Sequence, residues 1–317
     1  MAGVTNEIVP EELAGQRVDN FLIRHLKGVP KTRIYRLLRR GEVRVNGGRI
    51  KPTHRLNAGD RVRIPPVRLA ERDDIPPSQT VMERLENAIL LETDRLLVIN
   101  KPSGLAVHGG SGIAYGVIEA LRQMRPKAAF LDLAHRIDRD TSGCLVVAKR
   151  RSTLRSLHSL FRDGAVDKQY LVLVHGDLGA KVRRVNAALN VVSAKGGERC
   201  MQVDRQGQKA RTDFTALEQG SGWTLARANL YTGRMHQIRA HAQHIGHPVV
   251  MDNRYGNAEA DQAFRPLGLR RLFLHAESIR FETEATGPVH INAALPEDLE
   301  AVLTRLRKQP LIQPECN

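Results

Sequence analysis

Residues 131–150 read LDLAHRIDRDTSGCLVVAKR, and this stretch decides how the larger part of the chain folds. Two apolar runs, LDLA at 131–134 and CLVVAK at 144–149, have the length and composition of buried strands. The loop between them carries the ionisable residues His135, Arg136, Asp138, Arg139 and Asp140. A charged side chain beside buried strands loses contact with water, which costs free energy unless the charge is paired. This loop is therefore a candidate functional site. Structural ion pairs explain it equally well, and the residues alone do not choose between Asp138 and Asp140.

The segments on either side of this loop add strands and further polar residues. Upstream, LLVIN at 96–100 is a short apolar strand that leads into the turn KPSG, which lacks the pattern of a phosphate-binding loop. Downstream, KQYLVLVHG at 168–176 begins a strand on which Lys168 and Tyr170 face the same side, because they are two residues apart. These patterns predict a mixed α/β body.

A second polar cluster, TGRMHQIRAHAQHIGHPV, lies at 232–249. Arg234 ends a glycine-containing loop, and a helix follows with Ile238 and Ala242 facing inward. The cluster holds several histidines, but no HExxH, CxxC or flanking carboxylate completes a set of metal ligands. We therefore expect hydrogen-bonded helix histidines and no metal.

The charge of the chain is concentrated near its N-terminus. The 317 residues include 49 lysines and arginines and 34 acidic residues, a net charge of +15. Residues 15–68 hold 15 of the basic residues and three acids, a net charge of +12, so the rest of the chain is nearly neutral. A small, strongly basic module favours a polyanionic partner. Nucleic acid is favoured over an acidic membrane because the chain has no long amphipathic basic helix.

Within the basic module, the pattern predicts two short helices followed by strands. TRIYRLLRRG at 32–41 has an apolar stripe and ends at a glycine, which leaves a helix face of arginines that includes Arg33, Arg36 and Arg40. VRVNGGRI at 43–50 alternates into an Asn-Gly turn and presents Arg44 outward. We expect an order close to ααβββ. A solvated surface is the alternative explanation for the arginines.

The chain length and composition predict about two domains in a soluble, cytoplasmic protein. No apolar run approaches the roughly 18 residues of a membrane span, and the N-terminus has no export signal. Three cysteines without a CxxC fit a reducing compartment. We place the first domain at 1–75, with its core at about 15–68, a linker at 69–87 and the second domain at 88–317. A basic, hairpin-like segment at 181–215 either contacts RNA or is a solvated hairpin.

The first domain resembles the S4 family of RNA-binding domains. GQRVDNFL at 15–22, KTRIYRLLRRGEVRVNG at 31–47 and GDRVRIP at 59–65 occur in the order of that family. The resemblance implies an αL-like fold that binds structured RNA through its shape and phosphates.

The second domain resembles the RluA-type family of RNA pseudouridine synthases. The motifs that carry the resemblance occur in the family's order: HRIDRDTSG at 135–143, KQYLVLVHG at 168–176, TGRMHQIRAHAQHIGHPVVMDNRYG at 232–256 and RLFLHAESIRF at 271–281. The resemblance implies that Asp138 is the catalytic aspartate and that Arg234 is the arginine paired with it. It also implies that Tyr170 stacks on the target base and that Arg136 enters the RNA stack. Two departures, Ile137 and Met235, stand where leucine and threonine are usual.

Together the two resemblances imply an α+β chain whose catalytic domain has a mixed, largely antiparallel sheet. They imply isomerisation of uridine to pseudouridine in 23S ribosomal RNA, by a monomer without cofactor or guide RNA. His135 and Lys168 are further candidates for contact with RNA. A related synthase that acts on another ribosomal site or on transfer RNA is one alternative. A non-catalytic RNA-binding or ribosome-assembly factor is another.

Overall fold

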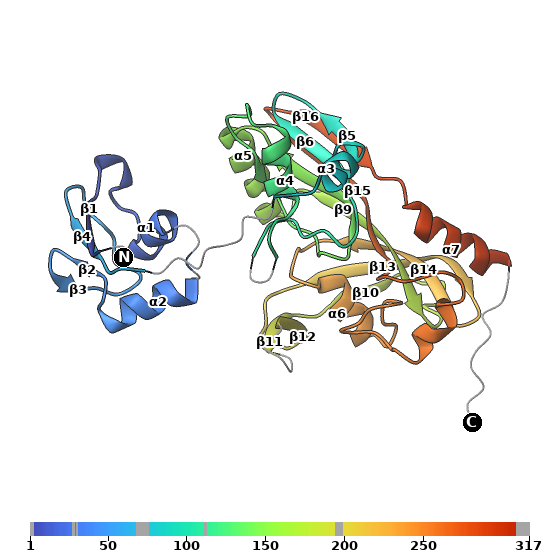
Figure 1. Cartoon of the computed structure of the whole chain (residues 1–317). Helices are drawn as coiled ribbons and strands as arrows, with labels where there is room; N and C mark the ends of the chain where they lie inside the picture. Colours follow the sequence, from blue (N-terminus) through green and yellow to red (C-terminus); the bar gives the residue numbers. More distant parts are fainter. Residues whose placement is uncertain are drawn as a thin grey trace. The chain divides into compact units, whose positions relative to one another are not determined.

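The computed structural model describes residues 3–26, 29, 31–67, 76–110, 113–193 and 199–308. It divides the chain into two compact units, Met1–Ile75 and Pro76–Asn317 (Figure 1). Residues 69–75 of the expected linker, residues 194–198 of the basic segment and Cys316 lie outside the described residues.

The first unit contains the predicted pair of helices and a small antiparallel sheet of order β1-β4-β2-β3. Its helices bury Phe21, Leu22, Ile34 and Leu37 against the sheet residue Val62. The order differs from the expected one because a strand precedes the helices, and this strand has no apolar alternation that would reveal it. The elements of the unit are β1 (Thr5–Ile8), η1 (Glu11–Leu13), α1 (Val18–His25), α2 (Lys31–Arg40), β2 (Arg44–Val45), β3 (Gly48–Arg49) and β4 (Arg61–Ile64).

The second unit is built on one ten-stranded sheet of order β10-β13-β14-β9-β15-β8-β6-β5, with β7 paired to β8 and β16 to β15. The pairing of β8 with β15 is parallel, and the other pairings in this sheet are antiparallel. The prediction of an α+β fold with a mixed, largely antiparallel sheet is thus confirmed. The strands are β5 (Ile89–Glu92), β6 (Leu96–Lys101), β7 (Asp132–Leu133), β8 (Ser142–Ala148), β9 (Asp167–His175), β10 (Arg183–Asn186), β13 (Arg211–Gly220), β14 (Trp223–Leu230), β15 (Leu274–Thr283) and β16 (Gly287–Asn292), beside a separate hairpin of β11 (Leu189–Ser193) and β12 (Arg199–Val203).

Helices cover both faces of the β6–β8 part of the sheet, which explains why these strands are apolar on both sides. Val146 of β8 packs with Leu157 of the helix α5, whereas Val147 packs in a second cluster with Leu121 of α4. Figure 1 shows α3, α4 and α5 at this part of the sheet and α6 near β10 and β13. None of the helices in the described ranges is long and apolar enough to cross a membrane. The helices are α3 (Gln79–Glu86), α4 (Val117–Met124), α5 (Arg151–Asp163), α6 (Gln237–His244), η2 (Ala260–Phe264) and α7 (Glu297–Lys308).

Helix α3 occupies most of the second half of the segment that was expected to be a linker. Ser78 caps its N-terminus by accepting a hydrogen bond from the Val81 backbone N–H, and Leu85 is fully buried beside α4. Acidic, proline and glutamine residues give this segment a linker-like composition, but Val81 and Leu85 at i and i+4 make one apolar stripe. The second unit therefore starts before residue 88.

The junction of β8 and β15 fixes the strand that follows the central loop. Gly143 of β8 lies opposite Ala276 of β15 and has a φ of 113°. A Cβ atom at position 143 would collide with the Ala276 backbone. Only glycine combines this φ with so close an approach of two strands, so the sheet itself requires glycine at position 143, which lies in β8 and not in the turn expected for TSG.

We expect Gly143→Ala to destabilise the second unit by at least about 2 to 3 kcal/mol. The alanine would have to adopt an unfavourable positive φ, and its Cβ would collide with the backbone of Ala276. Urea unfolding measures this change. The matched control is Gly287→Ala, which has a φ of 65° and open space around the new Cβ, and which should cost only about 1 to 2 kcal/mol. Equal losses in the two variants would contradict the collision.

Candidate functional site

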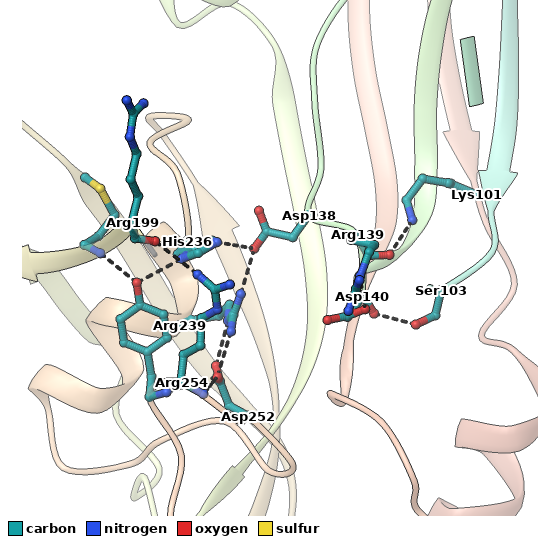
Figure 2. A network of polar contacts seen from close by, with 12 residues as sticks. Lys101, Ser103, Asp138, Arg139, Asp140, Arg199, His236, Arg239, Asp252 and Arg254 are labelled. Atoms are coloured by element: carbon teal, nitrogen blue, oxygen red, sulfur yellow. Dashed lines mark hydrogen bonds and ion pairs between the residues drawn. The ribbon is translucent and has the colours of Figure 1, made fainter. Parts of the chain in front are cut away.

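The loop between β7 and β8, which carries Asp138, is fixed by hydrogen bonds from the KPSG segment at 101–104. The Lys101 ammonium is fully buried and donates hydrogen bonds to the carbonyl oxygens of Pro102 (2.8 Å), Leu105 (2.8 Å) and Arg139 (2.9 Å). Burial lowers the pKa of Lys101 to about 7. Figure 2 shows Lys101 and Ser103 on one side of this loop, reaching the backbone next to Asp138.

On the other side of the loop, Asp138 faces two cationic or polar side chains (Figure 2). Arg239 places Nη1 3.3 Å from Asp138 Oδ2, and His236 places Nε2 3.9 Å from the same oxygen. The side chain of Asp138 is 20% exposed and that of Arg239 is 9% exposed. The pair is therefore largely shielded from water, which strengthens its electrostatic interaction.

Arg239 is itself fixed by a second carboxylate. Its Nε and Nη2 donate to the two oxygens of Asp252, each at 2.7 Å, and the side chain of Asp252 is fully buried. Burial alone lowers the pKa of the Arg239 guanidinium, but the hydrogen bonds and charges of Asp252 and Asp138 outweigh it and raise that pKa. The guanidinium thus stays charged and is held in one orientation.

The expected pairing of Arg234 with Asp138 is wrong, because Arg239 makes that ion pair. The loop before α6 is closed by the Gln237 side chain, which accepts a hydrogen bond from the Arg234 backbone N–H. This closure directs the Arg234 side chain to the carbonyl oxygen of Lys209, 3.1 Å from its Nε. Both arginines belong to TGRMHQIR. Sequence reasoning missed Arg239. The available signal was its position next to Ile238, on the inward stripe of α6.

A cavity of about 480 Å³ opens beside Asp138. Its walls include six candidate residues of the second domain, namely His135, Arg136, Asp138, Lys168, Tyr170 and Arg234, whereas Asp140 does not line it. Tyr170 is 7% exposed, and Lys168 and Tyr170 share one face of β9 as their spacing predicted. Burial raises the pKa of Tyr170, so its hydroxyl stays protonated. The size of the cavity is typical of sites for small ligands.

A second hollow of about 650 Å³ adjoins the first and shares Ile137, Asp138 and Arg239 with it. Arg136 is exposed and lines both hollows. The second hollow is rich in arginines, because Arg139, Arg254, Arg270 and Arg271 also line it. A polyanion that passes the mouth of the first cavity would meet this positive surface.

His135 forms part of the cavity wall as a neutral ring. Its Nε2 accepts a hydrogen bond from the Val146 backbone N–H at 3.1 Å, and its ring lies 4.9 Å from that of Phe161. Burial lowers the pKa of His135 to about 3. A cationic contact of His135 with RNA is therefore disfavoured at neutral pH.

Three histidines of the second cluster, His236, His241 and His247, are engaged in hydrogen bonds. Nδ1 of His236 lies 2.9 Å from the Tyr255 hydroxyl, which accepts a hydrogen bond from the Met201 backbone N–H. His241 contacts Thr212 and the Ala187 carbonyl. Within the described ranges, no group of three or more His, Cys, Asp or Glu side chains could hold a metal ion.

The candidate arginines of the first unit lie on α2 and β2. Arg36, Arg40 and Arg44 are exposed and Arg33 is half-buried. The nearest anionic partner of Arg40 is Glu42, at 3.9 Å, which is a weak surface contact. This helix face is thus available to a polyanion.

The whole chain is similar to known proteins. Residues 95–244 match the family model described as RNA pseudouridylate synthase, and residues 16–62 match that of the S4 domain. Ribosomal large subunit pseudouridine synthase C of Haemophilus influenzae is 50% identical over 95% of this chain and 94% of its own length. The protein of that name from Escherichia coli is 51% identical over 93% and 94%. The solved structure of human RNA pseudouridylate synthase domain containing 4 is 25% identical, with a TM-score of 0.59 over 73% of this chain and 97% of its own.

The pKa of His135 predicts a pH dependence of folding stability. Unfolded, the ring binds a proton near pH 6.5, whereas folded it does so only near pH 3, so stability falls as pH drops through this window. When the pH is lowered from 7 to 5, the free energy of unfolding measured in urea should fall by about 1 to 2 kcal/mol less for His135→Gln than for the wild type. The exposed His158→Gln is the matched control and should follow the wild type. Parallel curves for His135→Gln and wild type would contradict the buried neutral ring.

Proposed function

Because the chain belongs to the RNA pseudouridine synthase family, we propose that it isomerises specific uridines of 23S ribosomal RNA to pseudouridine, as its relatives named ribosomal large subunit pseudouridine synthase C indicate. One observation carries the catalytic assignment. The ion pair of Arg239 and Asp138 lies at the wall of a cavity that also contains Tyr170. A carboxylate with a fixed countercharge therefore faces a flat aromatic ring in a space of nucleoside size.

The reaction requires such a space. The bond between N1 and C1′ is cut, the uracil turns, C5 is joined to C1′ and loses its hydrogen as a proton, and N1 takes up a proton, so the base must first leave the RNA helix. The cavity beside Asp138 can receive the extruded base and shield it from water while it turns. No electron or phosphoryl group is transferred in this isomerisation, so we propose that the enzyme uses no cofactor.

Asp138 is the proposed catalytic residue. As a carboxylate it serves either of two routes, addition to C1′ or removal of the 2′ hydrogen. Arg239 donates a hydrogen bond to the Asp138 carboxylate and fixes its direction, and Asp252 keeps Arg239 in place. In this proposal Arg239 takes the pairing role that was expected of Arg234.

Other cavity residues are proposed to hold the substrate. Tyr170 presents its ring to the uracil through the rotation. Lys168 donates one hydrogen bond, to the Val166 carbonyl, and its remaining N–H groups are suited to oxygen atoms of the substrate. The exposed guanidinium of Arg136 lies at the cavity mouth, where it can fill the gap that the uridine leaves in the RNA stack.

The first unit is the proposed RNA clamp. Arg33, Arg36, Arg40 and Arg44 would bind phosphates and increase affinity without reading sequence. We further propose that the enzyme acts as a monomer in the cytoplasm and without a guide RNA, because the site is complete within one chain.

Tritium release from RNA labelled at C5 of uridine tests the activity, since a protein that only binds RNA cannot cause it. Release from 23S ribosomal RNA but not from transfer RNA would exclude the transfer RNA alternative. Mapping pseudouridines in ribosomal RNA from a strain that lacks the gene would identify the target uridines and separate this enzyme from the related synthase that acts on another ribosomal site. No release from either RNA would favour the assembly factor.

We expect Asp138→Asn to abolish detectable pseudouridine formation, because it keeps the size of the side chain and removes its charge. RNA affinity in a filter-binding assay should stay within about threefold. The matched control is Asp140→Asn, whose side chain is 46% exposed and pairs with Arg139, and which should remain active. Swapped outcomes would show that Asp140 is the catalytic aspartate.

We expect Arg239→Lys to lower the rate of tritium release by about 100-fold at every pH, because an ammonium cannot hold both Asp252 and Asp138 in a fixed geometry. The rate is measured per folded protein, since breaking the buried pair also costs stability. The matched change Arg234→Lys should lose less than about tenfold. A larger loss at position 234 would restore that arginine as the partner in the reacting complex.

A further inference from the structure

Tyr231 is a large side chain that remains exposed at the mouth of the cavity. It follows the last residue of β14, it is 48% exposed, and it lines the same cavity as Asp138. Single exposed aromatic residues are common on protein surfaces and need no function. This one lies at the opening through which a nucleotide must enter, so it is placed to contact RNA.

The ring of Tyr231 is covered on one face by an arginine. The Arg211 guanidinium carbon lies 4.1 Å from the centre of the ring, which is the distance of a cation–π stack. Nε and Nη2 of Arg211 donate to the two oxygens of Asp213 at 3.2 Å and 2.9 Å, and Asp213 is buried. Arg211 therefore has one fixed orientation above the ring.

The backbone fixes this pair as well. The Tyr231 N–H donates to the Arg211 carbonyl at 3.2 Å, and the Arg211 N–H donates to the Thr232 hydroxyl at 3.0 Å. Although the guanidinium covers one face, Tyr231 is still 48% exposed, so part of the residue remains accessible to water. The ring is thus rigid, half-covered and accessible, which lowers the entropic cost of binding a second flat group.

RNA supplies a flat group at this place. When a uridine leaves the helix, each neighbouring base loses a stacking partner, and where Arg136 covers one neighbour the other still lacks a flat contact. Proteins that bind unpaired RNA commonly stack bases on tyrosine rings and on arginine planes. Arg162 and Arg234 also line the cavity mouth and provide positive charge for the adjoining phosphates. The surroundings of Tyr231 therefore suit an unpaired nucleotide better than an uncharged ligand.

We propose that Tyr231, backed by Arg211, is a stacking platform for the unpaired RNA base next to the uridine that enters the cavity. This inference rests on the proposed function for the identity of the entering nucleotide. It assigns the platform to binding of the flanking nucleotide and leaves the chemical step to the residues around Asp138.

The test uses the full-length protein and a ribosomal RNA hairpin in which the wild type converts one uridine. Tyr231→Leu keeps an apolar side chain and removes the flat ring, so the KM for the hairpin should rise about tenfold, with kcat within about threefold. Tyr231→Phe restores the ring and should behave as the wild type. Leu217→Ala, at an exposed position on β13, is the surface control and should also behave as the wild type.

A spectroscopic measurement distinguishes stacking from a merely structural contact. With 2-aminopurine in place of the base on either side of the target uridine, binding to the wild type or to Tyr231→Phe should quench the fluorescence at one of the two positions. Tyr231→Leu should leave both positions unquenched at saturating protein. Arg211→Met, which removes the backing cation, should raise KM by less than Tyr231→Leu does.

Equal KM and equal quenching for Tyr231→Leu and the wild type would overturn the platform and leave the proposed function intact. If the wild type itself released no tritium, the proposed function would fail. The quenching difference between Tyr231→Phe and Tyr231→Leu would then still decide whether an unpaired base stacks on the ring.

Discussion

The site depends on one interaction, the bidentate ion pair between Arg239 and Asp252. Taking a carboxylate and a guanidinium out of water costs several kcal/mol per ion, and only close geometry with further hydrogen bonds repays it. Asp252 meets this requirement, since it accepts two hydrogen bonds from Arg239 and others from the backbone N–H groups of Arg254 and Tyr255. The pair leaves Nη1 of Arg239 directed at Asp138. Asp138, the proposed catalytic carboxylate, thus obtains its countercharge from a group that is already anchored elsewhere.

The loop of Asp138 is held independently of that pair. Lys101 binds the loop backbone through the Arg139 carbonyl, and Gly143 anchors the following strand against β15. Asp138 therefore lies between a rigid backbone support on one side and a rigid cation on the other. This arrangement keeps the carboxylate oriented before substrate arrives, which is the preorganisation that reduces the cost of reaching a transition state.

Much of the fold and part of the site could be predicted from the sequence. The apolar runs around 131–150 predicted β7 and β8 on either side of the Asp138 loop, and the spacing of Lys168 and Tyr170 predicted their common face. Strand β1 was missed because its four residues show no alternation, and α3 was taken for linker because its composition outweighed a two-residue stripe. Local patterns this short carry little information, and tertiary packing determines the outcome.

The misassigned arginine has a different cause. Arg234 and Arg239 are five residues apart in one motif, so spacing alone places both near the start of α6. What separates them is a hydrogen bond from the Arg234 backbone to the Gln237 side chain and a buried partner, Asp252, that is 13 residues downstream of Arg239. A helix that buries an arginine must bury its counterion too. The buried carboxylate of Asp252 therefore identifies Arg239 as the paired arginine. Arg234 ends in solvent-exposed contacts and can remain free to meet RNA at the cavity mouth.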